Sequence, residues 1–115
     1  MRGLGTATGL EITVDHGEGE TLVRLQGRLG IDSSPDLRDR LMALLREQSP
    51  RAITVDLAEV AYIDASGIAT LLEALKIART RETTLRLKGI HDRVLHLFEV
   101  TGLLPLFETT GGGST

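Results

Sequence analysis

The chain has 115 residues and a formal net charge of −3, which is the size of one domain and too short for two. Its residues are 41% hydrophobic and 25% charged, but only 3% are aromatic, so aliphatic side chains must fill the core. The acidic balance and scattered arginines argue against nucleic acid as the main ligand, and the lack of cysteine excludes disulfides and thiolate metal sites.

The two ends of the chain are expected to be flexible, which leaves residues 10–109 as the working domain. Residues 1–9 and 110–115 are rich in glycine, serine and threonine. No stretch approaches the roughly 18 apolar residues of a membrane span, and the N-terminus lacks the hydrophobic block of a signal peptide. These features predict a cytoplasmic protein that does not insert into a membrane.

The first predicted element is an antiparallel hairpin. Leu10, Ile12 and Val14 alternate with polar residues, which is the period of a strand with one buried face. Residues 16–20 contain two glycines and form the turn, and the second strand begins at residue 21. We expect Gly27 to end that strand.

A helix and a strand follow the hairpin. Ser33 or Ser34 is a candidate N-cap, and Pro35 suits the first helical turn. The helix is expected to stop at Ser49 and Pro50. The leucines spaced as one apolar stripe are Leu37, Leu41, Leu44 and Leu45. Residues 51–57 then alternate with a period of two and predict a central strand.

The second half repeats the alternation of helix and strand. Residues 66–80 have the apolar spacing of an amphipathic helix, and residues 84–89 alternate as a strand. A third helix starts near residue 91, with Val94, Leu97, Phe98 and Thr101 on one face, and ends at Gly102. The segment 103–108 is expected to be an edge strand or an apolar tail, packed on the core in preference to forming a docking patch. The element order predicts an α/β fold with a mixed sheet.

The stretch VAYIDASGIATLL places Asp64, Ala65, Ser66 and Gly67 where a strand period gives way to a helical one. A hydroxyl at a helix start has three roles open to it: it caps the helix, acts as a nucleophile, or accepts a phosphate that the helix terminus partly neutralises. Capping by Asp64 or Ser66 explains the acid and the serine. Gly67 costs about 1 kcal/mol in a helix relative to alanine, and we expect it to leave the Ser66 oxygen open to another protein.

Enzymatic and metal chemistry are disfavoured by the positions of the histidines. A serine nucleophile needs a base within hydrogen-bond reach, and no histidine is near Ser66 in sequence. His91 and His96 do not share a helix face, and no carboxylate pair completes a metal site. The sequence therefore predicts no enzymatic activity, no cofactor and no metal.

Two stretches, VDLAEVAYIDASGIATLL at residues 55–72 and VLHLFEVTGLLPLF at residues 94–107, resemble the STAS domains, in particular the bacterial anti-sigma factor antagonists. The likeness extends over nearly all of residues 10–109. Its most specific part is the element D-x-S-G at residues 64–67. The resemblance implies a mixed four- or five-stranded sheet with amphipathic helices mainly on one side.

The resemblance also implies a phosphorylation switch at Ser66. In such antagonists the corresponding serine is phosphorylated by the partner, an anti-sigma factor that is also an ATP-dependent serine kinase. The unphosphorylated antagonist sequesters that factor and frees the sigma factor, and a phosphatase restores the binding form. The contact surface expected here includes the loop of residues 30–34, the element at residues 64–67 and exposed positions of the helix that follows that element. Its named residues are Gly30, Asp32, Ser33, Asp64, Ala65, Ser66, Gly67, Glu73 and Lys76.

This sequence departs from the family pattern at two places. Many antagonists end the second strand with Gly-Glu-Leu-Asp, whereas this chain has Gly-Arg-Leu-Gly at residues 27–30, with the next acid at Asp32. Ala65 stands where many relatives carry another serine, which leaves Ser66 as the one phosphoacceptor of the element. These departures leave open an alternative that the family also implies: a STAS subunit of a phospholipid-transport ABC system, bound to the ATPase subunit.

Overall fold

The computed structural model describes residues 9–110, so most of the predicted flexible leader and tail, residues 1–8 and 111–115, lies outside the described residues. None of the helices in the described range is long and apolar enough to cross a membrane. The elements in chain order are β1 (Leu10–His16), β2 (Glu20–Leu29), α1 (Ser34–Ala43), η2 (Leu44–Gln48), β3 (Ala52–Ile63), α2 (Ala65–Thr80), β4 (Thr84–Lys88), α3 (Asp92–Thr101), η3 (Leu104–Leu106) and β5 (Glu108–Thr110).

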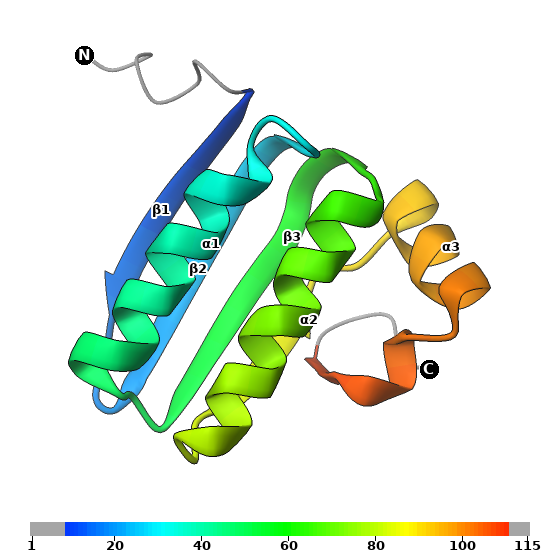
Figure 1. The fold of residues 1–115 in the computed structure, drawn as a ribbon. Helices are drawn as coiled ribbons and strands as arrows, with labels where there is room; N and C mark the ends of the chain where they lie inside the picture. The colour runs from blue at the N-terminus through cyan, green and yellow to red at the C-terminus, as the bar shows by residue number, and fades with distance from the viewer. Residues whose placement is uncertain (1–8, 111–115) are drawn as a thin grey trace.

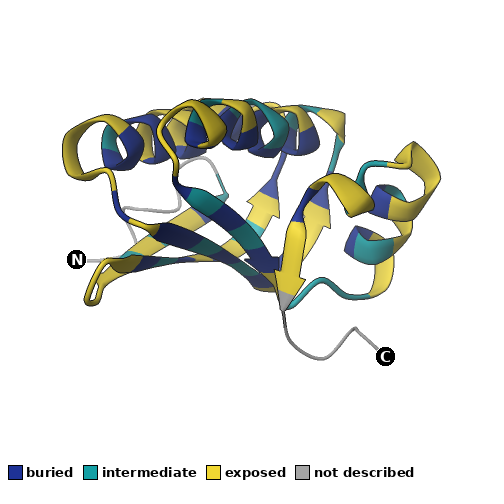
Figure 2. Cartoon of the chain, turned by 90° about the horizontal axis from the view of Figure 1, so that it is seen from below, coloured by how far each residue is buried: buried dark blue, intermediate teal, exposed yellow. Residues whose placement is uncertain are grey.

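The strands form one mixed sheet in the order β1-β2-β3-β4-β5. β1 and β2 pair antiparallel, and the remaining neighbours pair parallel through helical crossovers, as the element order predicts. α1 and α2 lie side by side over one face of the sheet, and α3 lies beyond α2 (Figure 1) and contacts β3. Figure 2 shows the opposite face of the sheet without a covering helix. The predicted α/β fold is therefore confirmed.

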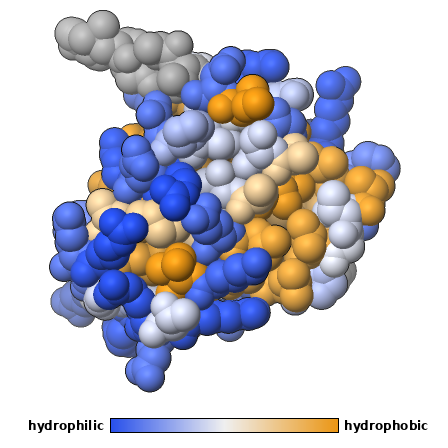
Figure 3. Space-filling model, viewed as in Figure 1, coloured by the Kyte–Doolittle hydropathy of each residue, from blue (hydrophilic) through white to orange (hydrophobic). Residues whose placement is uncertain are grey.

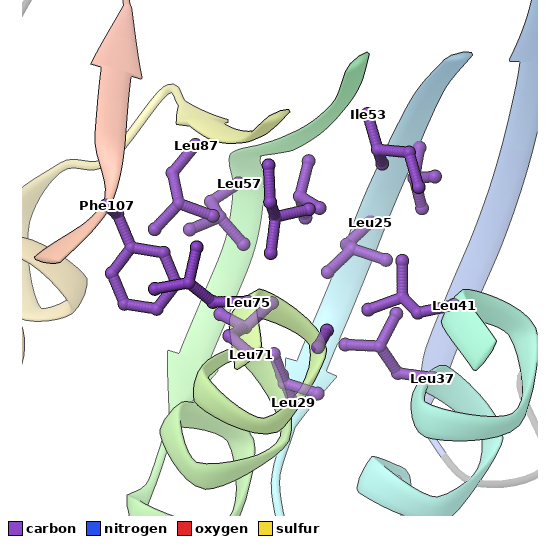
Figure 4. Packing of buried hydrophobic residues seen from close by; sticks show 14 of the residues in the cluster. Leu25, Leu29, Leu37, Leu41, Ile53, Leu57, Leu71, Leu75, Leu87 and Phe107 are labelled. Carbon is purple, nitrogen blue, oxygen red and sulfur yellow. The ribbon is translucent and has the colours of Figure 1, made fainter. Parts of the chain in front are cut away.

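The core lies between the sheet and the helix pair. Leucines of α1 and α2 point toward aliphatic residues of the central strands, and Phe107 closes the end near β5 (Figure 4). The Phe98 and Phe107 rings meet edge to face, with centroids 5.8 Å apart and planes at 86°. Fully buried residues of this core include Leu25, Leu29, Leu37, Leu41, Leu45, Ile53, Leu57, Leu71, Leu85, Leu87 and Phe98. The expectation of an aliphatic interior is confirmed.

The prediction that Gly27 ends the second strand is wrong, because β2 continues to Leu29. Gly27 adopts φ +113 inside the strand, and the carbonyl oxygen of Gly9 occupies the place where a Cβ would lie. A glycine is therefore needed for β1 and β2 to approach each other, and it marks a register shift instead of an end. β3 is also longer than predicted and reaches Ile63.

The helices differ from prediction only in detail. The first helix continues past α1 as a single π-helical segment, η2, and stops before Pro50 as expected. α3 ends at Gly102, which has φ +71, and buries Val94 and Phe98. Thr101 is exposed, and its hydroxyl donates to the carbonyls of the preceding turn. The segment after α3 buries Phe107 and adds the edge strand β5, as expected.

Candidate functional site

The starts of α1 and α2 lie next to each other at one edge of the sheet (Figure 1). β2 and β3 are parallel, so their carboxyl ends meet, and Leu29 pairs with Ile63 at the last register position. The backbone N–H of Asp64 donates to the carbonyl of Leu29 over 3.2 Å. The turn at residues 30–33 and the predicted phosphorylation element at residues 64–67 are thereby joined in one surface.

Asp64, and not Ser66, caps α2. Its Oδ1 accepts hydrogen bonds from the backbone N–H groups of Ser66 and Gly67, at 2.9 and 3.2 Å. Ser66 is half-buried, and within residues 9–110 its hydroxyl makes no hydrogen bond. The Ser66 oxygen therefore stands at the positive end of a sixteen-residue helix with its hydrogen-bonding capacity unused.

Gly67 has a different role from the one expected. It is buried, and a Cβ at this position would lie 2.7 Å from Leu29 Cγ, 2.8 Å from the Leu29 carbonyl oxygen and 3.0 Å from Ile63 Cγ1. The missing side chain allows the first turn of α2 to pack directly on β2 and β3. Gly67 thus fixes the position of the helix start and does not itself present a surface to a partner.

The turn before α1 is held by two buried hydroxyls. The Gly30 N–H donates to Ser33 Oγ over 3.0 Å, and Ser33 Oγ donates to the carbonyl of Arg28 over 2.8 Å. Ser34 Oγ donates to the Gly30 carbonyl over 2.7 Å. Ser33 occupies the N-cap position of α1 but makes no side-chain cap bond, and it is only 1% exposed. Neither serine caps α1 as predicted, and Ser33 shapes the turn instead of facing outward.

The remaining predicted contact residues differ in exposure. Asp32, Ala65 and Lys76 are exposed, whereas Gly30 is buried. A Cβ at Gly30 would lie 2.8 Å from Asp64 Oδ2, so the space that a side chain would need there is already filled. A side chain at this position would therefore require the Asp64 carboxylate to shift.

Glu73 is half-buried and already has a partner on α1. Arg38 donates two hydrogen bonds to its carboxylate, each 2.9 Å long, and so bridges α1 and α2. These hydrogen bonds hold the pKa of Glu73 below its usual value, against the opposing effect of burial, and they raise the pKa of Arg38. The Glu73 side chain is therefore less available to a partner than the sequence indicates.

Two residues of this surface, Arg28 and Tyr62, were not predicted from the sequence, and a third, Ile31, lies within the predicted loop of residues 30–34. The guanidinium carbon of Arg28 lies 4.2 Å from the centroid of the Tyr62 ring, and Tyr62 Oη lies 3.4 Å from Asp64 Oδ2. Ile31 is 72% exposed. They line a cavity of about 120 Å³ together with Gly30, Asp32, Ser33 and Asp64. The outward strand position of Arg28 and the apolar residue within a glycine turn were the available signals.

Comparison with known proteins places the chain in a family. A family model described as "Mlab, STAS domain" matches residues 12–107. An anti-sigma-B factor antagonist of Staphylococcus aureus (strain NCTC 8325 / PS 47) is 31% identical over 90 residues, covering 78% of this chain and 82% of that protein. The chain belongs to the STAS domain family. The resemblance inferred from residues 55–72 and 94–107 is thereby confirmed.

Other relatives agree with this assignment. The anti-sigma-B factor antagonist of Bacillus subtilis (strain 168) is 24% identical over 99 residues, which cover 86% of this STAS domain and 89% of that protein. The solved structure of an anti-sigma factor antagonist from Mycobacterium paratuberculosis matches with a TM-score of 0.82 at 18% identity, covering 93% of this chain and 90% of that one. At this identity the structural match supports the fold alone. The named relatives are regulatory proteins.

Proposed function

We propose that this STAS domain is an anti-sigma factor antagonist whose binding to an anti-sigma factor with serine kinase activity is controlled by phosphorylation of Ser66. The supporting observation is the unpartnered, half-buried Ser66 hydroxyl at a helix start whose cap is supplied by a different residue. The kinase transfers the γ-phosphoryl group of ATP to Ser66 Oγ, which loses its proton, and ADP leaves. A phosphatase hydrolyses the phosphoserine and restores the binding form.

Ser66 is also the hydroxyl of this surface that is free to react. Ser33 and Ser34 are buried, and their hydroxyl groups hold the turn at residue 30. Ala65 offers no hydroxyl. Phosphorylation of either buried serine would require the turn to open, whereas Ser66 requires no rearrangement of a hydrogen bond. This difference supports a single phosphorylation site in the element.

The switch acts through the interface and not through unfolding. A phosphoserine carries a charge of about −1.5 to −2, which the N-terminus of α2 partly offsets. The added dianion therefore stabilises the helix start. It also joins Asp64 and Asp32 on the same surface, so a partner that buries this surface must desolvate three negative groups. Repulsion and desolvation weaken the complex while the fold is retained.

The contact surface combines exposed residues with residues that shape it. Asp32, Ala65 and Lys76 are exposed to a partner, and Gly30, Ser33 and Gly67 set the backbone beneath them. Glu73 contributes mainly by fixing α2 to α1 through Arg38. We therefore expect the partner to cover the starts of both helices, where the exposed residues lie.

A second candidate function is binding to the ATPase subunit of a phospholipid-transport ABC system. Gly30 favours it, because many antagonists carry an aspartate at this position and the space is occupied here by Asp64. Neighbouring genes for a permease and an ATPase, with co-purification of that ATPase, would establish this alternative over the antagonist.

The proposed function is tested by incubating the protein with ATP and the candidate anti-sigma factor kinase of its own organism. Mass spectrometry then locates the phosphate. We expect one phosphate, on Ser66, and none in Ser66→Ala. Thr80→Ala is the matched control, since it removes an exposed hydroxyl from the other end of α2 and is expected to leave the labelling unchanged. Undiminished labelling of Ser66→Ala would reject the assignment.

A further inference from the structure

Ile31 is a large apolar side chain held outward on a fixed turn. It is 72% exposed, the highest value among the exposed large hydrophobic residues of the described chain. Figure 3 shows a small apolar spot within hydrophilic surface at the end of the molecule where α1 and α2 begin. Leaving such a side chain in water lowers solubility and gains no packing energy, so its exposure calls for an explanation.

The turn that carries Ile31 is rigid. The backbone N–H groups of Ser33 and Ser34 both donate to the Gly30 carbonyl, over 3.1 and 2.8 Å. The two serine hydroxyls add further bonds to Gly30 and Arg28, and both serines are buried. The chain therefore loses little conformational entropy here when Ile31 becomes buried against a partner. Rigid presentation of an apolar side chain is the condition for a binding hot spot.

Arg28 and Ile31 line the same cavity, and Arg28 brings a positive charge to it. The backbone of Arg28 is fixed on both sides, because its N–H donates to Gly9 and its carbonyl accepts from Ser33. Within residues 9–110 its side chain has the Tyr62 ring as a neighbour but no carboxylate partner and no hydrogen bond. The guanidinium N–H groups thus remain available, in a geometry that matches a carboxylate.

The nearby carboxylates do not satisfy Arg28. Asp64 Oδ1 is occupied by the two backbone N–H groups of α2, and its Oδ2 lies beside the Tyr62 hydroxyl. Asp32 follows Ile31 on the turn and is exposed. The surface therefore offers one apolar anchor with an unpaired cation on one side, which defines the chemistry of a complementary partner.

We propose that Ile31 and Arg28 are specificity-determining contacts for the anti-sigma factor kinase, whose facing surface offers an apolar socket for Ile31 and a carboxylate beside it for Arg28. This inference rests on the proposed function and extends it, since Arg28 lies outside the predicted contact set and Ile31 has no individual role in it. The socket supplies most of the affinity, and the carboxylate selects for a chain with a cation at this position.

The test measures the affinity of the kinase that labels Ser66 for the full chain and its variants by isothermal titration calorimetry. Ile31→Ala is expected to weaken binding by at least about tenfold, the loss typical of a buried anchor. Val100→Ala is the matched control, because Val100 is a β-branched residue that is 62% exposed on α3. It is expected to leave the affinity unchanged. Both variants are expected to keep the wild-type thermal midpoint, since neither side chain is in the core.

A second variant tests the charge. Arg28→Gln is expected to weaken binding at low salt, and the ratio of wild-type to variant affinity is expected to fall as the salt concentration rises. Wild-type affinity for both Ile31→Ala and Arg28→Gln, with Ser66 still labelled, would overturn this inference and leave the proposed function intact. A wild-type chain that is neither bound nor labelled would overturn both. Concentration-dependent dimerisation that Ile31→Ala abolishes would assign the surface to a second copy and also overturn the inference.

Discussion

Helices α1 and α2 begin at the same edge of the sheet, and each has serines in or next to its first turn. The hydrogen bonding of these serine hydroxyls differs between the two helices. At α1, Ser33 and Ser34 are buried and their hydroxyls are bonded to the turn backbone. At α2, Asp64 supplies the cap, and the Ser66 hydroxyl has no hydrogen-bond partner among the described residues. A serine at a helix start becomes available for chemistry only when another group satisfies the backbone N–H groups.

The two starts also use glycine differently. Gly67 has the backbone of Leu29 in the space of its missing side chain, whereas Gly30 has the flexible end of Asp64 there. The start of α2 is therefore fixed by packing against the sheet, and the turn before α1 is fixed by hydrogen bonds. The following predictions test this contrast in order of decreasing effect.

The largest effect is expected at Gly67. Helix propensity alone predicts that Gly67→Ala stabilises the protein by about 1 kcal/mol. The contacts with Leu29 and Ile63 predict the opposite sign, a loss of about 3 kcal/mol, at the upper end for overpacking because a carbonyl oxygen cannot move aside easily. Urea denaturation measures the free energy of unfolding. A more stable variant would show that α2 is not fixed by close packing here.

The next effect separates the serines. Ser33→Ala leaves the Gly30 N–H and the Arg28 carbonyl without their partner in a buried turn, which is expected to cost about 2 kcal/mol. Ser66→Ala removes no hydrogen bond and is expected to change stability by less than about 0.5 kcal/mol. Urea denaturation of both variants measures the two free energies of unfolding, and each variant serves as the control for the other. Equal losses would remove the contrast between the two helix starts.

A smaller effect is expected at the cap of α2. Asp64→Ala removes the acceptor for two backbone N–H groups, which is expected to cost about 1 kcal/mol, whereas Asp64→Asn keeps an equivalent cap and costs little. Amide hydrogen exchange at Ser66 and Gly67 locates the change. The assignment of Asp64 as the cap would be contradicted by protection of these amides in Asp64→Ala that equals the wild-type value.

The smallest effect is expected at the bridge between the helices. The Arg38 hydrogen bonds lower the pKa of Glu73, so the bridge stabilises the fold above the ordinary glutamate pKa of about 4.3 and this contribution is lost as the pH falls through the lowered value. Glu73→Gln is therefore expected to have a slightly lower Tm than wild type at pH 7, and this difference in Tm is expected to shrink as the pH falls below the ordinary glutamate pKa. Thermal melts across this range measure the difference. A difference in Tm between wild type and variant that grew as the pH fell would contradict the lowered pKa of Glu73.

The sequence predicts most of the fold, because the apolar periods alternate between strand and helix spacing in the same order as the elements of the structure, although β2 and β3 run past their predicted ends. Asp64 to Gly67 was found in the same way, since a capping acid marks the start of α2. The errors arise where a residue meets a partner far away in the chain. Gly27 reads as a strand end, yet its conformation depends on Gly9 across the hairpin. The sequence indicates that Gly67 exposes Ser66, yet a glycine is required there because Leu29 and Ile63 leave no space for a side chain.

The contact surface was predictable only in part for the same reason. Periodicity identifies outward positions such as Lys76, but it does not reveal that Arg38 engages Glu73 across the helix pair. Nor does it reveal that Ile31 remains exposed, because an apolar residue in a turn is as compatible with burial as with exposure. Pairings across elements decide which outward side chains are still available.

The central claim is that a phosphate on Ser66 prevents binding while the fold is retained. Calorimetric titration of the kinase with the unphosphorylated and the fully phosphorylated protein, with circular dichroism of both forms, tests it most directly. We expect the affinity to fall by at least about tenfold on phosphorylation, the equivalent of about 1.4 kcal/mol, with an unchanged spectrum. Equal affinity of the two forms, or loss of helical signal on phosphorylation, would contradict the account.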